Sequence, residues 1–276
     1  MDIVTQASLG ALCGEMVLGK QLGYRGALWG LLFGMLPDSD VLTYGILTAS
    51  EQLYWHRGIS HSILLMFASA IVFGGLLKWI HSGRKVSYWR YFIFLFLAWS
   101  THVLIDCFNT YGIQIMEPLN SQRFSIGNIS IIDIFFLAPL LLGLFLAVIV
   151  FRKKTNLRSH IGWLTTLWLC IYFAASLCMK HFAASHFKEM MAKKGIETEE
   201  LQTAPTFSNI FLWRMNARDD DHYYVSYWSL FDDENREPVI HKISHGHELE
   251  KGFENSEDLK TLKWFCRGWH KVFKVA

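Results

Sequence analysis

Charged residues are scarce in this chain of 276 residues. Asp, Glu, Lys and Arg make up 18% of it, whereas hydrophobic residues make up 52%. Soluble globular proteins carry about 25% charged residues, so this balance argues against an ordinary soluble domain and indicates a membrane protein. The net charge is only +2 and no long run of one sign occurs. We therefore expect no nucleic-acid partner.

Cysteine pairs are also missing. The five cysteines form no CxxC motif, and most lie in apolar segments where cysteine packs as a small hydrophobic residue. A disulfide framework is therefore not expected. The N-terminus has Asp2 where a secretory signal would have basic residues, so we expect the first apolar stretch to be retained.

Long apolar runs are present instead. Four are long enough to cross about 30 Å of hydrocarbon: 61–80, 91–109, 131–151 and 161–179. Two weaker segments precede them, 4–19 and 26–47, the second interrupted at Pro37. The sequence therefore predicts an α-helical polytopic membrane protein with about six membrane helices, of which the first two are short or broken.

Glycines recur at four-residue spacing in the two weak segments. They are Gly10 and Gly14 in the first, and Gly26, Gly30 and Gly34 in the second. Small residues at this spacing let helix backbones approach closely in lipid. We expect these two helices to pack tightly together.

Lysine and arginine concentrate in alternate short loops, and cytoplasmic loops carry that excess. The basic loops contain Lys20, Arg25, Lys78, Arg84, Lys85, Arg90, Arg152, Lys153, Lys154 and Arg158, whereas the other loops contain only Arg57 and Arg123. We expect a multi-pass protein of the bacterial inner membrane with the second set of loops outside.

Ionisable side chains gather at the external ends of these predicted helices. They are Asp38, Asp40, His56, His61, His102, Asp106 and Asp133, joined by Asp2 if the first helix starts outside. Each has an ordinary explanation alone: Asp38 and Asp40 as turn residues, His56 and His61 as interfacial groups, Asp133 as a helix cap. Ionisable groups at membrane depth are by default candidates for function, and their shared end of the membrane favours a metal site.

Spacing refines the predicted site. His102 and Asp106 lie one helical turn apart on one face, where they could bind one ion or simply each other. His56 and His61 would lie about 140° apart on a continuous helix, so they converge only if the helix starts later, for instance with Ser60 as its N-cap. Carboxylate and imidazole suit a divalent metal, most often zinc or manganese, with iron or a two-metal site also open.

The sequence resembles the YdjM-like family of LexA-regulated inner-membrane proteins, which are described as metal-dependent hydrolases. The matching stretches are "MDIVTQASLGA", "LPDSDV", "HRGISHS", "THVLIDCFNTYG", "RFSIGNISIIDIFF", "FLWR" and "LKWFCRG". The resemblance implies metal binding by Asp2, Asp38, Asp40, His56, His61, His102 and Asp106. One departure is Gln6, where many relatives carry histidine.

The charged C-terminal part predicts a second unit. Residues 1–180 would form the transmembrane metal-site domain and 181–276 a small soluble α/β domain on the external side. We expect a helix over 181–194, strands in "TFSNIFLWRM" and "HYYVSYWSLF", and a helix over 256–272 capped by Ser256. This unit could cover the mouth of the site.

These features together predict a membrane-bound metal-dependent hydrolase acting on a phosphoester or lipid-derived substrate. Asp38 or Asp40 would serve as general base or bridge a second ion, and Arg57 would hold a phosphate. The alternatives are a metal-stabilised scaffold or regulator without catalysis, and a metal or proton transporter. A transporter should have polar sites near the midplane, which this sequence lacks.

Overall fold

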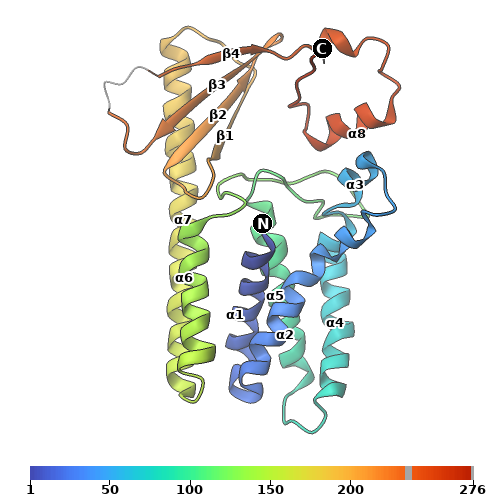
Figure 1. Ribbon diagram of the computed structural model, residues 1–276, viewed down its shortest axis with the longest axis vertical. Coiled ribbons are helices and arrows are strands. Elements are labelled where there is room, and N and C mark those ends of the chain that lie inside the picture. Colours follow the sequence, from blue (N-terminus) through green and yellow to red (C-terminus); the bar gives the residue numbers. More distant parts are fainter. Residues whose placement is uncertain (234–237, 275–276) are drawn as a thin grey trace.

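The computed structural model describes residues 1–233 and 238–274. Six helices lie side by side in one bundle, and a sheet and a short helix stand beyond the end where the N-terminus lies (Figure 1). The bundle helices are α1 (Ile3–Leu22), α2 (Tyr24–Met35), α4 (Ile63–Ile80), α5 (Tyr88–Cys107), α6 (Ile134–Leu144) and α7 (Thr155–Lys193). Helix α6 continues as a π-helical segment, Phe145–Val150.

Helices α1 and α2 are in backbone contact along their glycines, as predicted. A Cβ atom added to Gly10 would lie 2.1 Å from the carbonyl oxygen of Gly30, and one added to Gly14 would lie 2.0 Å from that of Gly26. Any side chain at these positions would therefore separate the helices. The two helices form a helical hairpin, and the turn between them is at Gly23, which has a positive φ of 63°.

Three described helices are long and apolar enough to cross a membrane: α4, α5 and α7. Ile134–Val150 is apolar but shorter. Helix α2 has 12 residues, and α1 carries polar side chains, among them Gln6 and Glu15, that are buried inside the bundle. The predicted count of six spans is therefore not supported, because the other three bundle helices are too short or too polar.

The chain leaves regular α-helix where the polar motifs occur. Helix α2 ends at Met35, and Pro37 opens a 3₁₀ helix, η1 (Leu36–Thr43), as expected for a proline that cannot continue an α-helix. After α3 (Ala49–Trp55) comes a single 3₁₀ turn, η2 (Ile59–His61). Helix α4 is capped by Ser62, which accepts a hydrogen bond from Leu65 N, so the predicted cap at Ser60 is two residues too early.

Helix α7 is the longest element, with 39 residues. It includes the predicted helix over 181–194 as its last turns, so the expected domain boundary at residue 180 falls inside one helix. At the bundle end opposite the N-terminus, Arg158 of α7 forms a buried ion pair with Glu15 of α1.

The C-terminal part contains a four-stranded antiparallel sheet in the order β1 (Glu200–Pro205), β2 (Leu212–Arg218), β3 (His222–Ser229) and β4 (His241–Ser244). The two predicted strands correspond to β2 and β3, whereas β1 and β4 were not predicted. Trp213, Met215 and Ala217 alternate along β2 and are fully buried in a core shared with Phe187 of α7. The sheet is therefore fixed to the end of this helix.

The last elements are a 3₁₀ turn, η4 (His247–Glu250), and helix α8 (Glu257–Phe265). Ser256 caps α8 as predicted, but the helix ends seven residues before the predicted position 272. Helix α8 lies over α3, where Trp264 contacts Tyr54 with ring centroids 5.2 Å apart.

Candidate metal centre

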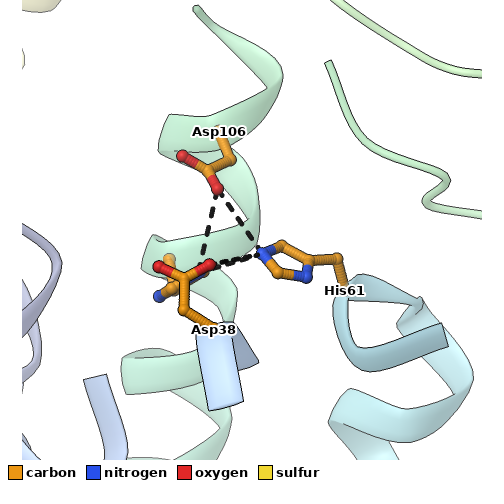
Figure 2. Close-up of side chains that lie close together, drawn as sticks. Asp38, His61 and Asp106 are labelled. Carbon is orange, nitrogen blue, oxygen red and sulfur yellow. Dashed lines mark hydrogen bonds and ion pairs between the residues drawn. The ribbon is translucent and has the colours of Figure 1, made fainter. Parts of the chain in front are cut away.

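Four side chains from three segments converge at the N-terminal end of the bundle. They are Asp38 of η1, His61 of η2, and His102 and Asp106 of α5. His61, His102 and Asp106 have fully buried side chains, and that of Asp38 is 14% exposed. Figure 2 shows Asp38, His61 and Asp106 turned toward one another from their separate elements.

The facing atoms are Asp38 Oδ1, His61 Nε2, His102 Nε2 and Asp106 Oδ2. The two Nε2 atoms are 3.1 Å apart. His61 Nε2 lies 3.4 Å from Asp38 Oδ1 and 3.5 Å from Asp106 Oδ2. His102 Nε2 lies 3.5 Å and 3.8 Å from the same two oxygens. Tetrahedral zinc bound at 2.0–2.1 Å separates its ligand atoms by about 3.3–3.4 Å, so these donors have the spacing of one metal site.

The outer nitrogens of both histidines are already engaged. His102 Nδ1 lies 2.7 Å from the carbonyl oxygen of Gly34, which can only accept, so this nitrogen carries the proton. His61 Nδ1 lies 2.9 Å from Ser60 Oγ, and that hydroxyl donates to Asp40. If both rings are neutral, their Nε2 lone pairs face each other, and a cation bound between them would remove this repulsion.

The carboxylates support the same conclusion. Asp38 Oδ1 and Asp106 Oδ2 are buried without a hydrogen bond, which is costly for an ionised oxygen. Asp106 Oδ2 has an ion pair with Arg57 at 3.1 Å. Its other oxygen accepts hydrogen bonds from Gln6 and Asn109 and contacts the Met1 amino group. The structure therefore fits a divalent cation among these four donors.

Asp40 and His56 lie beside the four donors, outside that group. Asp40 Oδ1 is 3.2 Å from His56 Nδ1, and Asp40 Oδ2 accepts from Arg57 N at 2.9 Å and from Ser60 Oγ at 3.0 Å. Although burial raises the pKa of Asp40, these hydrogen bonds hold it below its ordinary value. Asp40 thus organises the turn that carries His56, Arg57 and His61, and its own role as ligand stays a prediction.

Arg57 is a buried cation at the site, as is the Met1 amino group. Its backbone has a positive φ of 59°, a strained conformation that tends to occur at functional sites. The guanidinium lies beside Asp106 and 4.8 Å from the ring centre of Tyr111. Arg123 lies on the same ring and also over Phe265 of α8, so the C-terminal part reaches the rim of the site.

Two predicted acids have other positions. Asp2 caps α1, accepting from Val4 N at 3.1 Å and from Thr5 N at 3.0 Å. Asp133 caps α6 and accepts a hydrogen bond from Tyr172. Neither belongs to the four-donor group.

Several polar residues at the site were not predicted. Asn109 donates to Asp106 and accepts from Arg57, and Ser60 links His61 to Asp40. Gln6, noted above only as a departure, donates to Asp106 at 3.0 Å and so lies beside the ligands. Asn109 follows Asp106 by three residues near the helix end. This spacing, which places both side chains on one face, is the sequence signal that could have indicated their contact.

A second group of potential ligands occurs in the tail: His247, Glu250 and His270. Glu250 already forms ion pairs with Lys263 and His270. These contacts explain the group as an internal polar cluster.

A family model described as YdjM inner membrane protein matches residues 1–183. The chain belongs to this family. The YdjM region contains all four metal-ligand candidates and ends within α7, before the sheet. The chain is also similar to inner membrane protein YbcI of Escherichia coli (strain K12), with 31% identity over 127 residues, which is 44% of this chain and 70% of that protein. No solved structure matches the chain. Membership of the YdjM family gives the protein an inner-membrane location.

Proposed function

We propose that this YdjM-family protein is a metal-dependent hydrolase that cleaves a phosphoester or lipid-derived substrate at the inner membrane. The observation that carries the proposal is the convergence of Asp38, His61, His102 and Asp106 with both imidazole Nε2 atoms facing inward. Structural zinc sites are usually rich in cysteine thiolates, whereas histidine with carboxylate is the donor set of catalytic centres. Zinc or manganese fits this set best.

Each neighbouring side chain has a role in this proposal. The metal, when bound, would supply Lewis acidity and lower the pKa of a water molecule. Arg57 would bind a phosphoryl oxygen through its paired donors. His56, held by Asp40 at 3.2 Å, would move a proton to or from the substrate, with Asp40 fixing its ring orientation.

A lipid-derived or phosphate-bearing substrate is favoured by the position of the site. The centre lies at one end of the membrane helices, where a headgroup would be found. The basic loop residues lie at the other end of the bundle, and such residues favour the cytoplasmic side. We therefore infer that the metal centre and the C-terminal sheet are on the external side.

A metal-stabilised scaffold is the alternative, and one observation favours it. Four protein donors fill a tetrahedral coordination sphere, and a closed sphere is typical of structural sites. Catalysis requires an open coordination position for water or substrate. Either one carboxylate leaves the metal, or the coordination number rises from four to five. Asp38, the donor with an exposed edge, is the candidate for that movement.

The hydrolase and the scaffold differ in the role of Arg57, which would bind substrate only in the hydrolase. Purified protein loaded with zinc or manganese is assayed with a diester such as bis(p-nitrophenyl) phosphate and with phospholipid in mixed micelles. Arg57→Gln should keep the metal and lose turnover if the protein is a hydrolase. Metal-dependent turnover absent from the native protein with every substrate, despite stoichiometric metal, would instead support the scaffold.

A further inference from the structure

A cavity of about 690 Å³ extends around the edge strand β1 and is lined by the sheet, the outer part of α7 and the loop that follows α5. Its wall includes Thr110 and Ser125 from that loop, the β1 strand, and residues of β2 and α7. The cavity is separate from the metal donors but adjoins them in sequence, since Thr110 follows Asn109, which hydrogen-bonds to Asp106. Nothing in the proposed hydrolysis uses this space.

All four charged side chains that line the cavity are cationic: Lys180, Lys188, Arg214 and Arg267. No aspartate or glutamate lines it among the described residues. Within residues 1–233 and 238–274, no ion pair involves Lys188, Arg214 or Arg267. Cations gathered around one cavity without acidic neighbours create a positive potential there, which favours the binding of an anion.

Two of these cations are held in place by the fold. Lys180 donates to the backbone oxygens of Ile126, Gly127 and Thr203, which ties α7 to the loop and to β1. Arg214 lies on β2 between Trp213 and Met215, whose burial against α7 forces the arginine to the opposite face.

Arg267 is the most informative of the four. It follows the C-cap of α8 with a positive φ of 53°, a position that favours glycine. A glycine there would relieve the backbone strain. This strained turn places an exposed cation in the wall of a cavity that no acidic side chain lines among the described residues.

We propose that this cavity binds a phosphate group. The cations are joined in the wall by neutral hydrogen-bonding side chains, including those of Ser125, Asn216 and Tyr227. Arginine and lysine with such neutral donors form the usual environment of a bound phosphate. The ligand is either free phosphate or the headgroup of an anionic phospholipid, and the proposal does not depend on hydrolysis at the metal centre.

The test measures binding to the full-length protein in a nonionic detergent after chelation of metal, so that the metal centre cannot bind the probe. Inorganic phosphate and short-chain dihexanoyl phosphatidylglycerol are titrated separately by calorimetry. The cavity variant is Lys188→Gln with Arg214→Gln. The matched control, Lys193→Gln with Arg218→Gln, removes the same charges from the same helix and strand, but from residues already paired with Glu189 and Glu200.

We expect the cavity variant to bind at least one probe about tenfold more weakly, because two charge-assisted contacts are lost. The control should bind like the native protein. Arg267→Gly should weaken binding by a similar factor while keeping or raising the melting temperature, which separates loss of the anion site from loss of the fold.

The two probes show whether the bound phosphate group is free phosphate or part of a phospholipid headgroup. Binding of phosphatidylglycerol at least about tenfold tighter than phosphate indicates a lipid headgroup, and similar binding of both indicates free phosphate. The proposal is overturned if neither probe binds the native protein. It is also overturned if the cavity variant and the control variant lose the same amount of affinity for the probe.

Discussion

The loss of His102 should remove the metal, whereas the loss of His56 should not. Structural zinc sites with four ligands bind with about 10–16 kcal/mol, so one ligand contributes about 3–4 kcal/mol, or 10²–10³-fold in affinity. His102→Ala should therefore weaken zinc binding by about that factor. His56 Nδ1 is bonded to Asp40 and its ring lies outside the four donors, so His56→Ala should change affinity by less than about tenfold.

The assay is competition for zinc against a fluorescent chelator, with metal content measured on the purified variants. His160→Ala is the control for loss of a histidine, since His160 is exposed on α7 and its Nδ1 lies 2.7 Å from a backbone oxygen one turn away, that of Asn156. Thermal unfolding in chelator shows whether each variant folds without metal. Equal loss of metal in His56→Ala and His102→Ala would refute the four-donor assignment.

Four further outcomes are expected. A chelator should lower the melting temperature of the native protein, because a ligand at 100 times its Kd stabilises by about 2.7 kcal/mol; an unchanged value would argue against bound metal. Gly30→Ala should destabilise by about 1–3 kcal/mol, since its Cβ would lie 2.0 Å from a backbone oxygen of α1, whereas Gly75→Ala, in open space, should not. Trp213→Ala should cost about 3–5 kcal/mol in chemical denaturation if the sheet is packed on α7 as described. Glu15→Ala should cost a similar amount, about 3–5 kcal/mol, by leaving Arg158 buried without its partner, and Glu15→Ala with Arg158→Met should recover part of it.

The separation of His102 and Asp106 by one helical turn was enough to predict that they face one site. The segments around Asp38 and His61 were also expected to leave regular helix, at Pro37 and after His56. The choice between His56 and His61 could not be predicted, because it depends on Asp40, which comes from another segment and binds His56. Side-chain contacts of this kind are fixed by tertiary structure.

The fold was predicted best where periodicity was strong. Hydropathy located α4 and α5 well, and α1 was overestimated as a span because its polar side chains face the bundle interior. Strands β1 and β4, "ELQTAP" and "HKIS", have no clear alternation, so only their pairing with β2 and β3 defines them. The cationic cavity draws on residues from α7, β2 and the turn after α8, and no local pattern relates such distant positions.

The length of α7 has a mechanical consequence. Its 39 residues measure about 58 Å, roughly twice the hydrocarbon thickness, so if α7 spans the bilayer we expect about half of it to project beyond the hydrocarbon. A tilt of about 10° of such a rod displaces its far end by about 10 Å, and membrane spans adjust their tilt to bilayer thickness. Because Lys180 and Lys188 belong to α7 and Arg214 to the sheet packed on it, we expect a change in bilayer thickness that tilts α7 to move these parts of the cavity wall together.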